Sequence, residues 1–368
     1  MGKNKKKLIF FMPSIDGGGV EKNLILIANY FVKKLSKVSL ITYDKKFNHL
    51  FNKNIEIINV EQNKIKNVKK YYKYFRCLIL LVKEYFKYKK ILVFSFQANI
   101  YTIILSLFFD FKVVTRSNSS PTGWGQSKIK KLIFKIFFRF AEDIIVNSKK
   151  FKNEFKKEFN INSILIYNPL NKIEIIKKSK KNLNFNFFND KKTLKVINIA
   201  RFTDQKDHLT LLKSFEIVVK KIKCKLLIMG YGNNEKVMRH FIKKKKLNNV
   251  IKIINFKKNP YNYLRKADLF VLTSKFEGLP NVLLEAQALN KFVISSNCPT
   301  GPSEILKNGK YGDLFKIGDY KSLANLIINY NSRSYKYKSK IKLAYNNLER
   351  FDFETNCEKY FKTILKSL

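Results

Sequence analysis

Short apolar runs alternate with longer amphipathic segments along most of this chain, and that alternation constrains the fold more than any other feature. Each apolar run has the length of a strand, and each following segment has the apolar spacing of a helix. Strands that alternate with helices in this way form parallel sheets joined by right-handed crossovers. In the first half of the chain the expected strands are residues 8–12, 38–42, 55–60, 91–95, 112–115, 143–146 and 164–166.

The alternation stops once and then starts again, which predicts two domains. Residues 171–192 are rich in Lys and Asn and show no periodicity, so we interpret them as a linker. We expect Rossmann-like domains over residues 1–170 and 193–350, with two parallel sheets facing a cleft; the predicted fold class is therefore α/β. Residues 351–368 are expected to form a C-terminal helix, and packing back on the N-terminal domain is one arrangement open to it. Further strands are expected at 194–199, 225–229, 250–253, 269–272 and 292–295.

The charge of the chain is extreme, with 74 basic residues against 27 acidic ones and a net charge of +47. Three explanations stay open: binding of nucleic acid, attraction to anionic lipid, and a compositional bias that places lysine on every solvated face. No nucleic-acid recognition motif accompanies the charge. The helix expected at residues 128–140 mixes Ile, Leu and Phe with basic residues, so it could lie on a membrane surface or pack in the core. Its basic residues are Lys128, Lys130, Lys131, Lys135 and Arg139.

The sequence predicts a cytoplasmic protein without a membrane-spanning segment. The apolar run at 100–109 ends at Asp110, well short of the roughly 20 residues that a spanning helix needs. The apolar stretch near the N-terminus is too short for a signal peptide. Four scattered cysteines suit a reducing compartment, and three distant histidines form no ligand pair, so we expect neither a metal nor a cofactor.

The segment at residues 273–289, TSKFEGLPNVLLEAQAL, is the most informative loop. It follows an expected strand and opens a helix after Pro280, a residue suited to a first helical turn. A helix start offers free N–H groups and a positive dipole end, which together bind phosphate. Glu277 and Glu285 flank this helix start, and carboxylates accept hydrogen bonds from hydroxyl groups such as those of a sugar. The alternative is an acidic first turn that only complements the helix dipole.

On these motifs the chain resembles the family-4 retaining glycosyltransferases of the GT-B fold, whose signature is a glutamate pair with Glu-Gly-x-Pro at its front. The resemblance covers nearly the whole chain and follows the bacterial polysaccharide and lipid-linked glycan enzymes. Besides the loop above, it rests on ARFTDQKDHLTLLKSF (200–215), MGYG (229–232), NPYNYLRKADLFVLTS (259–274), SSNCPTGPSEIL (295–306) and GGGVEKNLILIANYF (17–31).

The resemblance implies a role for individual residues. Arg201 and Lys206 would pair with the donor diphosphate, and Glu277 would bind the transferred hexose as the third catalytic residue. Glu285 would hold the ribose hydroxyls. The implied donor-binding set is completed by Gly230, Gly232, Gly278, Leu279, Pro280, Asn281 and Val282, and the acceptor-side loop consists of Gly17, Gly18 and Gly19.

One position departs from the family pattern. Many members carry a histidine after the strand that matches residues 112–115, and here Arg116 stands there instead. An arginine cannot act as a base. Two readings stay open: Arg116 contacts the sugar or an acceptor phosphate, or it pairs with Asp143 as part of the structure.

The resemblance implies transfer of a hexose or N-acetylhexosamine from a nucleotide sugar, with a UDP-sugar as the favoured donor. The configuration of the anomeric carbon would be retained. The acceptor would be a glycan or a polyprenyl-linked molecule in cell-surface polysaccharide biosynthesis, with the enzyme in the cytoplasm or peripheral on the cytoplasmic face of the inner membrane. An anionic membrane surface is thus an open partner, and nucleic acid is not expected as one. The alternatives are a non-hydrolysing nucleotide-sugar epimerase of the same fold and a basic nucleic-acid-binding protein.

Overall fold

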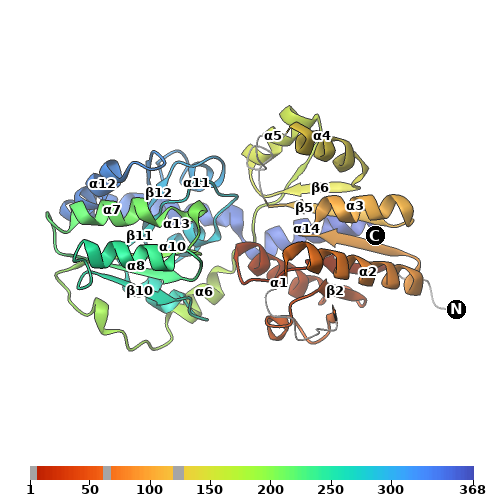
Figure 1. Ribbon diagram of the computed structural model, residues 1–368, viewed down its shortest axis with the longest axis horizontal. Coiled ribbons are helices and arrows are strands. Elements are labelled where there is room, and N and C mark those ends of the chain that lie inside the picture. Colours follow the sequence, from red (N-terminus) through yellow and green to blue (C-terminus); the bar gives the residue numbers. More distant parts are fainter. Residues whose placement is uncertain (1–5, 61–67, 119–127) are drawn as a thin grey trace. The chain divides into compact units, whose positions relative to one another are not determined.

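The computed structural model describes residues 6–60, 68–118 and 128–368, which form two compact units. Unit 1 consists of Met1–Pro169 together with Phe353–Leu368, and unit 2 consists of Leu170–Asp352. Each unit contains its own parallel sheet with helices on both faces (Figure 1). None of the helices in the described parts of the chain has the length and apolar character needed to cross a membrane.

The sheet of unit 1 has seven strands in the order β3-β2-β1-β4-β5-β6-β7, all parallel. Its central strands are almost continuously apolar because helices cover both faces of the sheet. In β1, for example, all five residues of the sequence KLIFF are buried. The strands are β1 (Lys7–Phe11), β2 (Val38–Thr42), β3 (Glu56–Asn59), β4 (Ile91–Ser95), β5 (Lys112–Ser117), β6 (Asp143–Val146) and β7 (Ile164–Leu165).

The helices of unit 1 divide between the two faces of this sheet. On one face, α1 (Gly19–Phe31) packs against the C-terminal helix α14 (Phe353–Ser367), and both share a core with alternate residues of β1 and β4. The other face is covered by the helices of the following crossovers, which share a second core. These helices are α2 (Lys70–Tyr88), α3 (Asn99–Phe108), α4 (Lys128–Phe137), which continues as the 3-10 turn η3 (Phe138–Phe140), and α5 (Lys149–Phe159).

The sheet of unit 2 has six parallel strands in the order β10-β9-β8-β11-β12-β13. The order reverses between β8 and β11, as in a doubly wound Rossmann sheet. The strands are β8 (Leu194–Ile199), β9 (Cys224–Gly230), β10 (Ile251–Asn255), β11 (Leu269–Leu272), β12 (Phe292–Ser296) and β13 (Asp313–Phe315).

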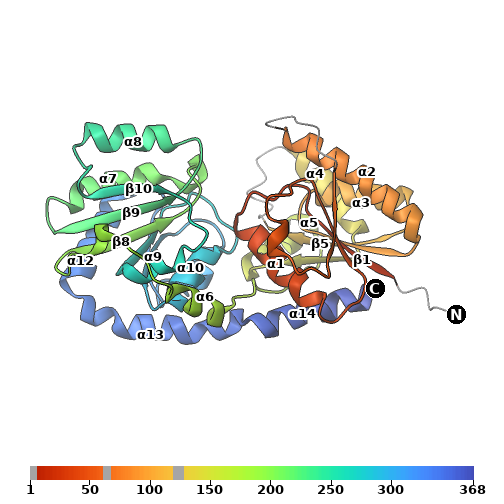
Figure 2. The same cartoon turned by 90° about the horizontal axis from the view of Figure 1, so that it is seen from below.

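Helices cover both faces of this second sheet as well (Figure 2). Apolar residues of α7 (His208–Val218), α8 (Glu235–Lys244) and α12 (Tyr320–Ser332) form one core with the strands. On the other side α10 (Asn281–Ala288) contacts three helices. These are α6 (Lys172–Ser179), α11 (Gly301–Ile305) and α13 (Lys338–Asn346), and α6 also packs on α9 (Tyr261–Lys266).

The expectation that residues 171–192 form a linker is wrong. This segment contains the helix α6 and the 3-10 turn η4 (Asn186–Phe188), and it belongs to unit 2. Asn171 caps α6 by accepting a hydrogen bond from the N–H of Glu174, and Ile175 and Phe188 are buried. The helix is short and strongly basic, so its periodicity is weak in the sequence and tertiary packing stabilises it.

Candidate functional site

The residues expected to bind the donor lie on loops at the reversal point of the sheet in unit 2. One loop follows β8 and runs to the start of α7, and it carries Arg201 and Lys206. The other follows β11, runs to the start of α10, and carries Glu277. Because β8 and β11 are neighbouring parallel strands, both loops begin at the same C-terminal end of the sheet. Ligands of open α/β sheets bind at this kind of position.

Hydrogen bonds join the two loops directly. The N–H of Lys275 donates to the carbonyl of Gln205 at 2.8 Å, and the side-chain amide of Gln205 donates to the carbonyl of Phe276 at 2.8 Å. The hydroxyl of Thr273 donates to the carbonyl of Lys206, also at 2.8 Å. The relative position of Lys206 and Glu277 is therefore held by the backbone as well as by their own side chains.

Lys206 and Glu277 form an ion pair, with 2.5 Å between Nζ and Oε1. The side chains are 14% and 8% exposed, so solvent screens the pair only weakly. Ser274 donates a further hydrogen bond to the same Oε1 at 2.6 Å. Among the residues that the structure describes, Oε2 of Glu277 has no hydrogen-bond partner, which leaves one carboxylate oxygen available to a ligand.

Arg201 differs from Lys206 in its surroundings. Its side chain is exposed and makes no ion pair or hydrogen bond with any described residue, although it follows the same strand. The structure thus brings Lys206 and Glu277 together and leaves Arg201 as a free cation on the same loop. A free guanidinium at a strand end can pair with two phosphate oxygens at once.

The two glycines after β9 are required by close packing against the loop that follows β8. A side chain on Gly230 would place its Cβ 1.9 Å from the carbonyl oxygen of Ala200, and one on Gly232 would lie 2.4 Å from that of Phe202. Gly232 also has a φ of +147°. These glycines therefore shape the loop that carries Arg201, and an effect on a bound nucleotide would come through that loop.

The remaining donor-side residues lie at the start of α10. Pro280 precedes the first residue of the helix, Asn281, as expected from the sequence, and Leu279 is buried beneath this turn. Gly278 and Val282 are half-buried. Glu285 lies one turn further along α10 and is 8% exposed.

A third loop, which sequence reasoning did not assign to the site, supports the Glu277 loop from behind. It follows β12 and leads into α11. Ser296 donates to the carbonyl of Ser274 at 2.6 Å, Thr300 donates to the carbonyl of Glu277, and the N–H of Gly301 donates to the carbonyl of Gly278 at 2.8 Å. We call Ser296, Thr300 and Gly301 the brace.

Thr300 adopts an unusual backbone conformation within this brace, with φ of +82° and ψ of −122°. Non-glycine residues in such conformations persist where the surrounding structure over-determines them, often at functional sites. Gly301 is equally constrained, because a Cβ there would lie 2.0 Å from the carbonyl oxygen of Gly278. The Thr-Gly-Pro sequence, which three residues separate from the end of β12, was the available signal for this loop.

The brace also sets the direction of the peptide that follows Glu277. In a planar trans peptide the C=O and the next N–H point to opposite sides. Because Thr300 holds the carbonyl of Glu277 on the brace side, the N–H of Gly278 points away from the brace. A backbone donor in this position suits an anionic ligand at the carboxyl edge of the sheet.

The expected acceptor-side loop lies at the carboxyl end of β1 in unit 1. Gly17 has a φ of +83°, Gly18 is the N-cap of α1, and Gly19 is its first residue. A Cβ on Gly17 would lie 2.9 Å from the ring of Phe47. The loop is thus a tight entry into a helix at the reversal point of the first sheet.

Arg116 is not available to a ligand in this structure, nor does it pair with Asp143. Its side chain is fully buried at the end of β5. Nε donates to the hydroxyl of Tyr360 at 2.9 Å, and the two terminal nitrogens donate to Asn168 and Asn118. All these partners are neutral, and they tie the C-terminal helix α14 to the sheet of unit 1. Sequence reasoning could not foresee this contact because Tyr360 is 244 residues away.

A buried histidine stands next to the Lys206 loop. His208 is 3% exposed, its ring nitrogens have no hydrogen-bond partner among the described residues, and its ring packs edge-on against Phe202. Burial, together with the nearby charge of Lys206, lowers the pKa of His208 to about 4. The imidazole is therefore neutral at physiological pH and belongs to the packing beneath the loop.

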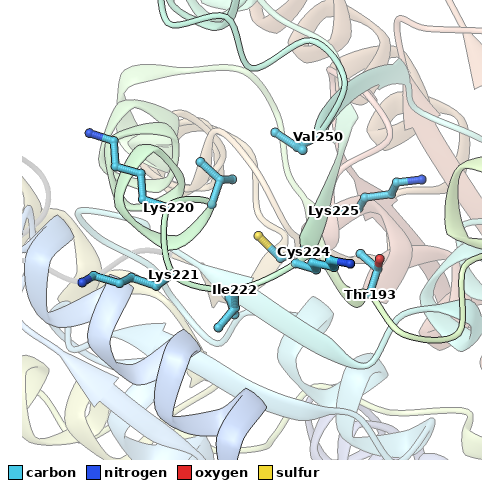
Figure 3. A pocket seen from close by; sticks show the side chains of 9 residues that line it. Thr193, Lys220, Lys221, Ile222, Cys224, Lys225 and Val250 are labelled. Carbon is cyan, nitrogen blue, oxygen red and sulfur yellow. The ribbon is translucent and has the colours of Figure 1, made fainter.

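A hollow of about 450 Å³ in unit 2 lies away from these loops, at the N-terminal ends of the strands (Figure 3). Its lining includes Thr193, Cys224 and Val250, which stand at the starts of β8, β9 and β10. Lysines surround it, but no residue of the two site loops contributes to it. In the described parts of the chain, His, Cys, Asp and Glu side chains do not gather in any group of three or more.

The part of the chain that carries these loops matches a known protein family. Residues 179–347 match the family model of the glycosyl transferases group 1, and this range includes both site loops and the brace. Over 188 residues the chain is 36% identical to an uncharacterised glycosyltransferase of Methanocaldococcus jannaschii, covering 49% of this chain and 46% of that protein.

A second relative is named for its reaction. It is the Campylobacter jejuni N-acetylgalactosamine-N,N'-diacetylbacillosaminyl-diphospho-undecaprenol 4-alpha-N-acetylgalactosaminyltransferase, 24% identical over 54% of this chain and 53% of that protein. This chain therefore matches about half the length of these curated relatives.

The whole chain has structural neighbours. The crystal structure of Anabaena HepE in complex with UDP and glucose aligns with a TM-score of 0.83 and 19% identity, covering 99% of this chain and 100% of that one. The expected fold class is confirmed, since this chain has two parallel sheets and its structural neighbours are GT-B proteins. The chain thus has the GT-B fold and carries a domain of the glycosyl transferases group 1 at residues 179–347.

Proposed function

We propose that this protein is a retaining glycosyltransferase of family 4, which moves a hexose or N-acetylhexosamine from a UDP-sugar to a glycan or lipid-linked acceptor. The observation that carries the proposal is the meeting of Lys206 and Glu277 at the reversal point of the second sheet. One residue supplies a cation for phosphate and the other a carboxylate for hydroxyl groups. A nucleotide sugar contains both kinds of group within one molecule.

The donor diphosphate would lie between Lys206 and Arg201. Lys206 has three N–H donors, so it can keep its bond to Glu277 and still contact a phosphate oxygen. Arg201 is exposed and unpaired among the described residues, and its fork fits two oxygens. The N–H of Gly278 and the start of α10 would add backbone donors.

The transferred sugar would bind through Glu277. Its Oε1 is occupied by Lys206 and Ser274, and Oε2 is open to a sugar hydroxyl. Glu285, one turn into α10, would accept hydrogen bonds from the ribose. The brace would keep the intervening backbone in place while the bond to the sugar breaks.

Two exposed aromatic rings at the C-terminal ends of β9 and β10 would stack on the nucleobase of the donor. Tyr231 follows β9 and is 41% exposed, and Phe256 follows β10 and is 44% exposed. The N–H of Phe256 donates to the carbonyl of Gly230, so the two strand ends are adjacent. Aromatic faces stack on bases of any identity. The UDP in the HepE crystal structure supports uracil as the base that these rings would bind.

The reaction would follow a front-face route with retention. The bond between the anomeric carbon and the phosphate oxygen breaks, and the acceptor oxygen bonds to the same face of that carbon. The acceptor proton passes to the leaving phosphate oxygen, so no protein base is needed. Arg201 and Lys206 would stabilise the charge that grows on the diphosphate, the kind of electrostatic term that dominates many enzymes.

The names of two relatives support a choice of acceptor. The Campylobacter enzyme is named for a diphospho-undecaprenol substrate, and a further relative is named for amylovoran biosynthesis. We therefore propose a growing polysaccharide or a polyprenyl-linked glycan as acceptor, with the protein at the cytoplasmic face of the membrane and without a nucleic-acid partner.

A donor panel tests the proposal. Purified protein is mixed with UDP-, GDP- and ADP-linked sugars and a lipid-linked acceptor, and the product is followed by mass spectrometry and NMR. We expect transfer from a UDP-sugar with the anomeric configuration retained. Conversion of the donor to its epimer without acceptor, or binding of oligonucleotides but of no nucleotide sugar, would contradict it.

A further inference from the structure

The surface of α2, α3 and α4 in unit 1 is unusually apolar. These helices, with the turn η3, carry more than half of the exposed large apolar side chains in the described chain. Phe108 is 78% exposed and Ile129 is 74% exposed, which is costly for side chains of this size in water. Such concentration in one place marks an interaction surface rather than scattered exposure.

The exposed side chains form one continuous surface. The three helices cover the same face of the sheet, and α3 packs against both α2 and α4 (Figure 2). Ring contacts join α2 to the α3 segment at both ends, since Tyr74 contacts Tyr101 and Phe86 contacts Phe109.

Core packing does not account for the apolar residues on the outer side of α4. The inner side of α4 consists of Phe134 and Phe137, which pack on the core. Phe134 also stacks on Phe138. Ile129 and Leu132 lie outside this contact, and Leu132 is 57% exposed. The helix is therefore apolar on two sides, and within the described part of the chain only one of them contacts the core.

The charge of this surface is predominantly positive. The only carboxylate in α2, α3, α4 and η3 is Glu84, which is buried and bonded to Lys7 at 2.6 Å. The exposed basic residues of the same elements are Lys70, Lys83, Lys87, Lys128, Lys135 and Arg139. Within these elements the apolar side chains are thus flanked by cations and by no exposed carboxylate, although one exposed carboxylate, Asp110, stands two residues after the end of α3.

We propose that α2, α3 and α4 form a docking surface for an anionic lipid bilayer. Ile129, Leu132 and Phe108 would enter the boundary between headgroups and acyl chains, and the basic residues would contact lipid phosphates. A second copy of the chain fits less well, because it would bring two cationic surfaces together. Nucleic acid would attract the lysines but offers nothing to Ile129 and Leu132. The inference deepens the membrane location given in the proposed function. Because the surface contains no residue of the donor site, its test is separate from the test of the proposed transfer.

Sedimentation of the full-length protein with vesicles tests the proposal. We compare vesicles of phosphatidylcholine and phosphatidylglycerol with vesicles of phosphatidylcholine alone. The apolar variant is Phe108→Ser/Ile129→Ser/Leu132→Ser, and its matched control is Ile173→Ser/Val237→Ser/Leu343→Ser, three exposed apolar residues of unit 2. We expect at least about a tenfold loss of affinity in the first variant and none in the control.

A second pair of variants tests the charges. Lys128→Gln/Lys135→Gln/Arg139→Gln should weaken binding about tenfold or more, and the loss should shrink at high salt. The control removes the same charge from α8, as Lys236→Gln/Lys243→Gln/Lys244→Gln. Far-UV circular dichroism and the midpoint of urea unfolding, measured on every variant, should stay at the wild-type values and show that unit 1 is folded.

Three results would overturn the proposal. One is equal binding of wild type and both test variants to anionic vesicles, and another is equal binding of the wild type to neutral and anionic vesicles. The third is a wild-type dimer that the Ser variant dissociates without any vesicle binding, which would identify the surface as a self-contact. Loss of UDP binding in the donor-site variants alone would bear on the proposed transfer and not on this surface.

Discussion

Lys206 and Glu277 form a 2.5 Å ion pair between the loops that follow the neighbouring strands β8 and β11. The resemblance to glycosyltransferases implied that one of them binds the diphosphate and the other the sugar. In the structure the two side chains are each other's ion-pair partners. The pair therefore serves to hold two weakly exposed charges in position, and a donor would enter by adding contacts rather than by separating them.

Removing the carboxylate charge should affect transfer more than binding. Glu277→Gln keeps the shape of the side chain and loses a charge-assisted hydrogen bond, worth about 1.5–3 kcal/mol or roughly ten- to hundredfold in rate. UDP affinity should change little. The matched control is Glu216→Gln, which breaks a lysine pair at the surface of the same unit. Wild-type turnover by a folded Glu277→Gln protein would contradict the proposed role.

Removing either Arg201 or Lys206 should abolish most activity, but only the loss of Lys206 should also lower the stability of the fold. Arg201→Ala and Lys206→Ala should each lower transfer by about two orders of magnitude, because the leaving diphosphate loses a counter-charge. Lys206→Ala also leaves Glu277 unpaired at 8% exposure, which should lower the free energy of unfolding by about 3 kcal/mol. Arg201→Ala should unfold like the wild type, and Lys213→Ala serves as an exposed control.

The double variant Lys206→Ala/Glu277→Ala separates the two effects. Removing both charges relieves the unpaired carboxylate, so stability in urea should return towards the wild-type value while transfer stays low. Recovery of activity together with stability would show that the pair is structural only.

Arg201→Lys should be nearly as slow as Arg201→Ala, because an ammonium group lacks the forked pair of donors that a guanidinium offers to two phosphate oxygens.

Transfer should survive chelation of metals. The sequence has no Asp-x-Asp pair to hold a divalent cation on the diphosphate. Each cation about 4 Å from a phosphate contributes roughly 4 kcal/mol at an effective dielectric near 20, so Arg201 and Lys206 are sufficient counter-charges. Initial rates with and without EDTA should agree. Loss of activity in EDTA with recovery in Mn²⁺ or Mg²⁺ would show that a metal holds the donor.

The brace should control the donor loop through one hydroxyl group. Thr300→Val removes the donor to the carbonyl of Glu277 and leaves that oxygen without its partner. We expect kcat/KM to fall about tenfold, from a lost hydrogen bond of about 1–1.5 kcal/mol. Thr300→Ser keeps the hydroxyl and should retain most activity. Equal rates for the two variants would limit the brace to a packing role.

His208 should make the protein less stable in mild acid. Its pKa is about 4 in the folded protein and about 6.5 when unfolded, so the unfolded state binds an extra proton between these values. This contribution to stability is fully present above pH 6.5 and is lost as the pH falls towards 4, by about 3 kcal/mol in total. Urea unfolding at several pH values should show a shallower dependence for His208→Leu, whereas the exposed control His240→Leu should match the wild type.

The regular parts of both sheets could be predicted because their sequences are nearly self-sufficient. The strands β2, β4, β6, β8 and β11 have the bounds expected from their apolar runs. Helix α10 begins at Asn281 as expected, since Pro280 suits a helix start and an apolar pattern follows. Short elements such as β13 and α6 were not foreseen, because three to eight residues carry too little periodicity.

The sequence by itself determined which residues are candidates for the site: the glutamates at 277 and 285, the cations at 201 and 206, and the helix start between them. Local spacing and residue chemistry single out the two glutamates and the helix start, and the resemblance to the glycosyltransferase family supplies the two cations. Only the tertiary structure decided which of them meet, because β8 and β11 become neighbours through pairing across 73 residues of chain. The same long-range packing removed Arg116 from the site and added Thr300 behind it, and no local pattern encodes contacts of that kind.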